Sequence, residues 1–442
     1  MKALSFACTC DWILSVDSPP IPNGWIVVVD GIIDFVGDTL PQRFESLEQR
    51  NLGHGAILPG LINSHCHLEF SDLDVPIKVP DQGCIVDWLS EVIKHRRSLA
   101  TSMADPIAHR RATYEKGLRE AYCTGTRLLV DNITAPWSAD WVEQAAGDFG
   151  PIGLRVAPAI ELVDVTKQRC EETLKFAKDV LSTPANHSSL IAPGLAPHAP
   201  YTASKRLVAQ AVSMAKEKNT WVSMHLAEST QELSWTKDRT GPIANWITPW
   251  TDEEHRREIG TIEEILLLLR DAPKTLIAHG NYLSQRAIEI LAQHPNRFAV
   301  VYCPRTHRHF GHDIHPLAEL EFAGVPVLLG TDSRASNPDL SIFREWQTAC
   351  RAFPEIHPMQ ILKCCTTSPR DFFSTYAQIG KLVEGSPPAL TWIPFQTELP
   401  DIQLNTSSIR TFEDPTLWLK MLSADDASPI ELHPSLSVFF AK

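Results

Sequence analysis

Short apolar stretches alternate with amphipathic stretches along most of the chain. Eight of the apolar stretches are four to eight residues long and rich in aliphatic and β-branched side chains, a pattern typical of strands. They span residues 56–62, 126–133, 153–160, 189–195, 221–224, 275–278, 298–302 and 326–330. Because the stretches are almost continuously apolar, we expect strands that are buried on both faces.

The stretches between these strands predict helices. Residues 204–218, 261–270 and 284–293 carry apolar side chains at spacings of three and four, which place them on one helical face. Strands that alternate with helices indicate a parallel sheet, and eight such units favour an α/β protein with a (β/α)8 TIM barrel over an open sheet. The helical region at 85–124 is longer than the others and is a candidate lid over the active site.

Both ends of the chain have the pattern of β structure. Residues 25–33 are β-branched around a turn at Asp30-Gly31, and residues 380–397 alternate strand-like stretches with Gly and Pro. Neither end carries enough strand to close a sheet alone. We therefore expect residues 1–58 and 380–442 to form one composite β-sandwich domain beside a barrel of residues 59–379.

Composition narrows the classes of partner. The 442 residues are 43% hydrophobic and carry a formal net charge of -13, which repels phosphate backbones and argues against nucleic acid. No apolar run is long enough to span a membrane. The ten cysteines are scattered without a C-x-x-C pair, so we expect reduced thiols in a cytoplasmic protein with a small-molecule substrate. A homo-oligomer is expected only from the frequency with which large barrels associate.

Ionisable side chains follow five of the eight predicted strands. In a barrel, the C-terminal ends of the strands form one face, and that face carries the active site. A single histidine at a strand end is commonly structural, whereas five marked ends indicate a shared site. The side chains are His65 and His67 after the first strand, His198 after the fourth, His225 and Glu228 after the fifth, His279 after the sixth and Asp332 after the eighth.

The spacing of these residues points to a metal centre. His65 and His67 lie two apart on an extended segment, so both point to the same side. With His225 and Asp332 they offer three imidazoles and a carboxylate, a set that suits one Zn²⁺ or Fe²⁺ ion. Such an ion lowers the pKa of a bound water to about 7 and makes hydroxide available at neutral pH.

Three further residues have candidate roles around that centre. Glu228, three residues after His225, is placed to shuttle a proton, although it also fits the role of an acid at a helix N-terminus. His279 is expected to hold the attacking hydroxide or orient the substrate, and His198 to contact the substrate. We therefore predict that the catalytic residues are Glu228, His279 and Asp332.

Five segments, taken in order, resemble the deaminase and chlorohydrolase branch of the amidohydrolase superfamily. They are ILPGLINSHCH at 57–67, PHAPYT at 197–202, HLAE at 225–228, AHG at 278–280 and GTDS at 330–333, with GKLVEGS at 380–386 similar to that branch's return to its β domain. The resemblance implies metal ligands His65, His67, His225 and Asp332. It also implies Glu228 and His279 as acid/base residues, and His198 as a substrate contact.

The resemblance further implies the reaction. Asp332 accepts the proton of the attacking hydroxide, Glu228 protonates a ring nitrogen, and ammonia leaves. The enzyme would then be a hydrolase acting on carbon–nitrogen bonds other than peptide bonds. Binuclear members usually carry a carboxylated lysine at the end of the fourth strand, and residues 189–196 contain no lysine, which argues for a single metal ion.

The segment after the seventh strand departs from the branch's usual Cys-Pro-x-Ser-Asn. It reads Cys-Pro-Arg-Thr-His from Cys303 and continues with more histidines: the four are His307, His309, His312 and His315. We interpret this segment as a pocket wall in which Arg305 or His307 touches the substrate. A second metal site is the alternative.

Two segments bear on the substrate. HLEFS at 67–71 and DWLSEVI at 87–93 are similar to members that deaminate aminodeoxyfutalosine. Trp88 offers a stacking face and Glu69 an acceptor for hydroxyls, although Trp88 fits a core position equally well. We expect an adenosine-type nucleoside such as aminodeoxyfutalosine, with guanine-like bases and chlorinated triazines as other substrates to consider. Amide or carbon–halogen hydrolysis at the same metal and an inactive scaffold are the competing functions.

Overall fold

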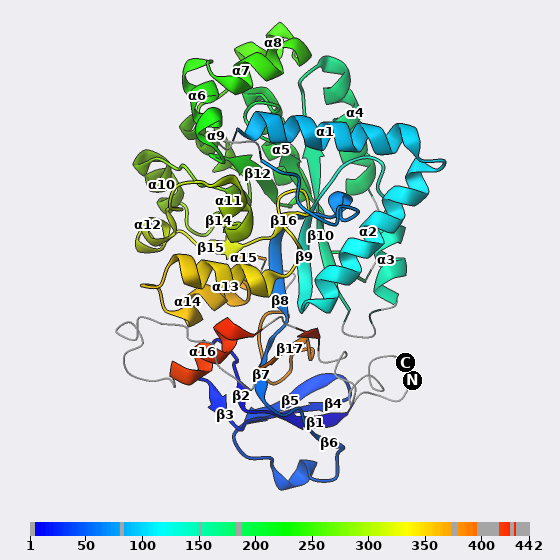
Figure 1. Cartoon of the computed structure of the whole chain (residues 1–442), viewed down its shortest axis with the longest axis vertical. Helices are drawn as coiled ribbons and strands as arrows, with labels where there is room; N and C mark the ends of the chain where they lie inside the picture. Colours follow the sequence, from blue (N-terminus) through cyan, green and yellow to red (C-terminus); the bar gives the residue numbers. More distant parts are fainter. Residues whose placement is uncertain are drawn as a thin grey trace.

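A curved parallel sheet surrounded by helices forms the larger part of the molecule (Figure 1). The computed structural model describes residues 5–79, 84–147, 149, 153–182, 188–373, 379–395, 415–424 and 428–429. The sheet strands are β8 Leu61–His67, β9 Thr126–Ile133, β10 Arg155–Leu162, β11 Gly194–Pro197, β12 Val222–Leu226, β13 Thr275–His279, β14 Phe298–Tyr302 and β15 Val327–Leu329. Each strand pairs in parallel with its neighbour in sequence.

The sheet curves round to its own first strand. The short strand β16 (Asp332–Ser333) follows β15 directly and pairs in parallel with Cys66 and His67 of β8. The last unit of the sheet therefore meets the first, as in a TIM-like barrel. The prediction of this α/β architecture is confirmed.

Two predicted strand boundaries need correction. The stretch at 56–62 divides at Gly60, so that β7 (Gly55–Pro59) belongs to a different sheet and the barrel begins with β8. A Cβ atom at Gly60 would lie 2.4 Å from the side chain of Arg127, which is why the chain needs glycine at this crossing. The fourth strand is short, and Leu190 of the predicted 189–195 forms only an isolated bridge to Val156.

Side-chain caps start the three predicted helices. Ser204, Thr261 and Ser284 accept hydrogen bonds from backbone N–H groups at the starts of α5 (Lys205–Lys218), α9 (Ile262–Leu269) and α10 (Gln285–Ala292). The region at 85–124 forms two helices, α1 (Ile85–Ser102) and α2 (Pro106–Cys123). The other helices are α3 Ala139–Gly147, α4 Lys167–Leu181, α6 Thr230–Asp238, α7 Pro242–Ile247, α8 Glu253–Arg257, α11 Pro304–Phe310, α12 Leu317–Phe322, α13 Ile342–Ala352, α14 Pro358–Lys363, α15 Thr367–Phe372 and α16 Pro415–Ser423.

Two smaller sheets lie at the opposite end of the barrel from α1 and α7 (Figure 1). One contains β5 (Ile32–Gly37), β4 (Trp25–Val29), β1 (Phe6–Thr9) and β6 (Gln49–Asn51), and the predicted turn joins β4 to β5 with positive φ at Asp30 and Gly31. The other contains β18 (Ser428–Pro429), β17 (Leu390–Pro394), β7, β2 (Trp12–Ile13) and β3 (Ile21–Pro22). Segments from both ends of the chain therefore share a sheet, with Ile57 paired to Trp392.

The C-terminal segment also reaches the barrel helices. In α16, Trp418 lies 6.4 Å from Trp346 of α13 between ring centroids. Gln347 of α13 donates through Nε2 to the carbonyl oxygens of Met421 and Ala424, at 3.1 and 2.8 Å. Most of the predicted β domain beyond residue 395 lies outside the described residues.

Two further observations concern the cysteine side chains and the character of the helices. All ten cysteines are free, and burial raises the pKa of the Cys364 thiol to about 12, so this side chain stays a neutral thiol. Within the ranges described above, no helix combines the length and the apolar character needed to cross a bilayer.

Candidate active site

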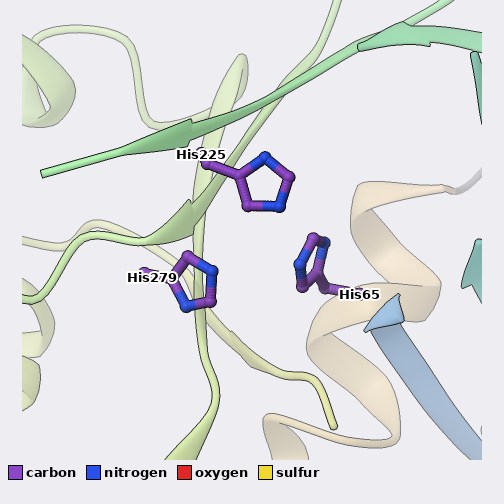
Figure 2. Close-up of side chains that lie close together, drawn as sticks. All are labelled: His65, His225 and His279. Carbon is purple, nitrogen blue, oxygen red and sulfur yellow. The ribbon is translucent and has the colours of Figure 1, made fainter. Parts of the chain in front are cut away.

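Imidazoles and a carboxylate meet at the C-terminal ends of the barrel strands. His65 and His67 come from β8, His225 from β12, His279 from the end of β13 and Asp332 from β16. Figure 2 shows the rings of His65, His225 and His279 around a common point. His67 Nε2 lies 3.2 Å from His225 Nε2, and Asp332 Oδ1 lies 3.6 Å from His65 Nε2 and 3.7 Å from His67 Nε2. The structure thus brings the four predicted metal ligands together.

The donor atoms fit a cation. His225 Nδ1 donates to the carbonyl oxygen of His198 at 2.9 Å, so the lone pair of His225 is on Nε2, the atom that faces His67. Neither ring nitrogen of His65 has a hydrogen-bond partner in the described part of the chain, although both are buried. Nitrogen atoms that converge with a carboxylate in this way match the donor set of Zn²⁺. Among the described residues, three or more possible ligand atoms lie within 4.8 Å of one another only in the groups His65/His225/His279 and His65/His67/Asp332.

Burial sets the protonation of the imidazoles. It lowers the pKa of His67 and of His279 to about 3 and lowers the pKa of His225 well below its usual value. All three rings are therefore neutral near pH 7, which is the form that binds a metal. Burial would raise the pKa of Asp332, but the imidazoles of His65, His279 and His67 hold it well below its usual range.

The second carboxyl group behaves in the opposite way. Glu228 is 6% exposed, and its Oε1 lies 3.6 Å from His279 Nε2. Burial, together with the nearby charges of Asp332 and Glu232, raises the pKa of Glu228 well above its usual value. One protonated and one ionised carboxyl group in the same site can divide the roles of acid and base.

Three strand ends carry strained backbone. Ala227, His279 and Asp332 have φ angles of 54°, 69° and 56°, in the left-handed region that costs a non-glycine residue about 1–2 kcal/mol. Hydrogen bonds hold these positions: His315 Nε2 donates to the carbonyl oxygen of His279 at 2.9 Å, and Ser336 Oγ donates to Asp332 Oδ2 at 2.6 Å. Such strain is found at sites where side chains must be aimed.

A cavity of about 750 Å³ opens onto this group of residues. Helix α1 forms part of its wall, and so does the segment between β12 and β13, which includes α7 and the 3-10 helix Thr248–Trp250. The described lining includes aromatic rings, guanidinium groups and carboxylates: Phe70, Trp88, Tyr201, Trp246 and Trp250; Arg96, Arg97 and Arg169; Glu69 and Glu161. Whether α1 moves as a lid stays a prediction.

Three of the four predicted substrate contacts line the cavity. His198 does so while its Nδ1 lies 2.7 Å from Thr202 Oγ1. Trp88 also lines the cavity, yet it is 7% exposed and donates through Nε1 to the carbonyl oxygen of Ala335, so it is both wall and core. Glu69 is already paired, because its Oε2 lies 2.7 Å from Arg110 and 3.3 Å from Arg96.

The structure corrects the prediction that Arg305 contacts the substrate. Among the described residues that line the cavity, neither Arg305 nor His307 occurs. Arg305 Nε lies 2.6 Å from the fully buried carboxylate of Glu345, and its terminal nitrogen lies 2.8 Å from Asp339. A buried carboxylate needs such a counter-charge, and this need explains the arginine without a substrate.

The histidines after β14 have separate partners. His309 Nε2 donates to the carbonyl oxygen of Ile77 at 2.9 Å, and His312 Nδ1 lies 3.2 Å from the hydroxyl of Tyr282. Neither of the two convergent groups in the described residues includes any of these four histidines. The alternative of a second metal site therefore has no support here.

Several residues of the site were missed from the sequence. Glu161 ends a strand in the same way as the histidines, so the signal used for them would have found it. Trp246 and Trp250 lie in the segment between β12 and β13, where no periodic pattern points to the cavity. Glu232 accepts hydrogen bonds from the backbone N–H groups of Ala227 and Glu228. Its place three residues after the helix cap Ser229 was the available signal in the sequence.

Comparison with known proteins gives the following relationships. The model of the Amidohydrolase family matches residues 56–412. The 5-methylthioadenosine/S-adenosylhomocysteine deaminase of Bacillus cereus is 29% identical over 341 residues, which cover 76% of this chain and 71% of that protein. The Helicobacter pylori aminofutalosine deaminase in complex with methylthio-coformycin has a TM-score of 0.73 at 17% identity, covering 96% of this chain and 97% of that one. An adenosine deaminase from Xanthomonas campestris with bound zinc has a TM-score of 0.68 at 18% identity, covering 96% and 92%.

Proposed function

Because the chain belongs to the amidohydrolase family, we propose that it is a metal-dependent deaminase that replaces the amino group of an adenosine-type nucleoside with oxygen and releases ammonia. The observation that carries this proposal is the convergence of His65, His67, His225 and Asp332 at the ends of the barrel strands, with the buried carboxyl group of Glu228 3.6 Å from His279. The names of the bacterial relatives, which are deaminases of adenosine derivatives, agree with it.

We assign His65, His67, His225 and Asp332 as the ligands of one divalent ion. The convergence of their side chains and the free lone pair of His225 support the assignment, and the set suits Zn²⁺ best, with Fe²⁺ as the second choice. When bound, the ion lowers the pKa of a coordinated water and polarises the substrate. The bound zinc of the Xanthomonas campestris structure agrees with the first choice.

The protein side chains supply the proton transfers. Glu228, whose pKa burial raises, donates to the ring nitrogen next to the amine-bearing carbon. Asp332, whose pKa the neighbouring histidines lower, accepts one proton from the attacking water, and that proton ends on the leaving amine. The second proton of the water returns to Glu228 as the carbonyl group of the product forms. His279 lies 3.6 Å from Glu228 and orients the reacting groups.

This division of roles favours deamination over the competing reactions. An amine is a poor leaving group until it is protonated, whereas chloride leaves without a proton. A site in which burial raises the pKa of Glu228 while the neighbouring histidines lower the pKa of Asp332 favours such a division of acid and base roles. No observation specifically favours the chlorohydrolase, amide hydrolase or scaffold alternatives.

The cavity suits a nucleoside with a charged arm. Its volume of about 750 Å³ lies in the range of sites that hold a whole small ligand, and the aromatic residues Trp88 and Tyr201 line the same cavity as the proposed metal ligands. Arg96, Arg97 and Arg169 line the wall on α1 and α4, where a negative group on the 5′ substituent would be stabilised. Aminodeoxyfutalosine is the substrate we test first.

We further propose that residues 1–58 and 380–442 form one β-sandwich domain and residues 59–379 the barrel domain. The pairing of β7 with β17 supports this division. A shared apolar cluster supports it too, because it joins Phe6 and Ile26 of one small sheet to Ile57 and Trp392 of the other.

Ammonia release tests the proposed reaction. Enzyme loaded with Zn²⁺, and separately with Fe²⁺, is assayed with aminodeoxyfutalosine, 5′-methylthioadenosine, S-adenosylhomocysteine and adenosine, and with guanine and atrazine as comparison compounds. We expect turnover of at least one nucleoside. If no compound yields ammonia while elemental analysis shows bound metal, the proposal is wrong.

A further inference from the structure

Glu232 makes an unusual set of hydrogen bonds just after β12. It is the third residue of α6, whose cap Ser229 accepts from the N–H of Glu232 at 3.2 Å. A glutamate at this position commonly bonds back to the N–H of the cap residue, as Glu264 does with Thr261 at 3.0 Å at the start of α9. Glu232 reaches further back: Oε1 accepts from Ala227 N at 2.8 Å, and Oε2 accepts from Glu228 N at 2.9 Å.

The backbone carbonyl groups of Ala227 and Glu228 are also hydrogen-bonded. The carbonyl oxygen of Ala227 accepts from Tyr282 N at 2.9 Å, and that of Glu228 accepts from Asn281 Nδ2 at 3.0 Å. All four backbone polar groups of Ala227 and Glu228 are therefore paired, two of them by the single carboxylate of Glu232.

The backbone needs this support. Ala227 has a φ of 54°, a conformation that an alanine does not keep without outside contacts. Glu232 is 0% exposed, so no water replaces its two bonds. Burying a carboxylate costs free energy. The use of a buried carboxylate to bind two backbone N–H groups therefore indicates that the geometry of this loop matters.

We propose that Glu232 is a positioning residue of the deamination site. Its carboxylate fixes the backbone of Ala227 and Glu228, and so keeps the Glu228 side chain beside His279, 3.6 Å away, where it serves the substrate. Glu232 acts only through Glu228, and the inference therefore rests on the proton-donor role proposed above for Glu228. Misplacing a reacting group by about 1 Å costs on the order of 100-fold in rate.

The first test is E232Q, which keeps the size of the side chain but turns an NH₂ donor toward a backbone N–H. We expect kcat to fall about 10- to 100-fold. KM should change less than about threefold and the metal content should stay the same, because the ligands and the cavity wall are untouched. The matched control is E264Q, which alters the ordinary capping glutamate of α9 and should leave kcat unchanged.

A double-mutant cycle separates positioning from a general structural role. If Glu232 acts through Glu228, E232Q should cost less than about threefold in an E228Q background, because the residue it positions is already disabled. An equal loss of kcat in both backgrounds would overturn the proposal. If E232Q does not fold, E232D takes its place in the same cycle, since it keeps the charge and shortens the reach by one methylene.

Amide hydrogen exchange gives a readout that does not depend on turnover. In metal-loaded protein, the amides of Ala227 and Glu228 should exchange faster in E232Q than in wild type, and should be unaffected in E264Q. Unchanged exchange in E232Q would overturn the proposal even if activity fell. If wild type itself releases no ammonia, the proposed function fails, while the exchange experiment still decides whether Glu232 holds this loop.

Discussion

Two groups of histidines follow barrel strands in this protein, and they behave differently. The site group is His65, His67, His225 and His279; the α11 group is His307, His309, His312 and His315. The α11 group is much denser, with four histidines in nine residues. Only the site group brings its ring nitrogens together with a carboxylate, whereas His309, His312 and His315 hydrogen-bond to separate carbonyl or hydroxyl groups.

The backbone explains the difference. Alternate residues of a strand point to one side, and the ends of eight barrel strands aim at one axis, so distant residues share a direction. Successive residues of a helix point about 100° apart, so neighbours such as His307 and His309 diverge. A metal site therefore follows from shared direction and not from the local density of histidine.

The largest effect is expected from D332N, which removes the negative charge of the carboxylate that lies among the histidines of the site group. We expect the bound metal to be lost and kcat/KM to fall about 1,000-fold or more. Elemental analysis of the purified protein and the ammonia assay measure the two effects. Full metal content together with wild-type activity would show that Asp332 is not part of the centre.

E228Q should separate the effect of losing proton transfer from the effect of losing the metal ion. We expect the metal to stay bound while kcat falls about 100- to 10,000-fold, because the proton donor is gone. In wild type, the pKa of Glu228 is raised and the protonated form is the active one, so kcat should fall as pH rises through that pKa. Wild-type turnover by E228Q would contradict the assigned role.

H315F tests a hydrogen bond that links the two groups. His315 donates to the carbonyl oxygen of His279 at 2.9 Å, and its ring stacks on Tyr302 at 4.1 Å between centroids. Phenylalanine keeps the stacking and removes the donor, so we expect about a tenfold loss of kcat, the equivalent of one hydrogen bond. H315Q, which retains a donor, should lose less, and equal losses in the two variants would argue against the hydrogen bond as the cause.

The smallest effect is expected from H309A in the α11 group. It removes the hydrogen bond to Ile77 and should lower the free energy of unfolding by about 1 kcal/mol in urea denaturation. The metal content should not change, and kcat should stay within about twofold of wild type. Loss of metal from H309A would erase the distinction between the two groups.

The sequence was sufficient to predict the barrel and the convergence of the proposed ligands, because both depend on local patterns. The strand at 298–302 and the helix predicted at 204–218 were found from the apolar periodicity alone. His65, His225 and Asp332 were found because strand ends in a barrel face one site.

What the sequence could not give depends on contacts between distant segments. Arg305 binds Glu345, which lies forty residues later, and no residue near Arg305 in the sequence indicates that partner. The split at Gly60 depends on Arg127, and the walls at Trp246 and Trp250 depend on how an inserted segment folds back over the barrel. Long-range packing overrides local pattern at each of these places.

The pairing of β7 with β17 has a consequence for biosynthesis. While the chain is being made, β7 emerges early, but its antiparallel neighbour β17 is not available until residue 390 has left the ribosome. Until then β7 presents an open edge, which is a template for aggregation. His65 and His67 lie on β8, which is separated from β7 by the single residue Gly60. The first two proposed ligands therefore follow directly after a strand whose partner β17 is synthesised late. Nascent chains stalled before residue 390 should therefore depend on chaperones more than completed ones do.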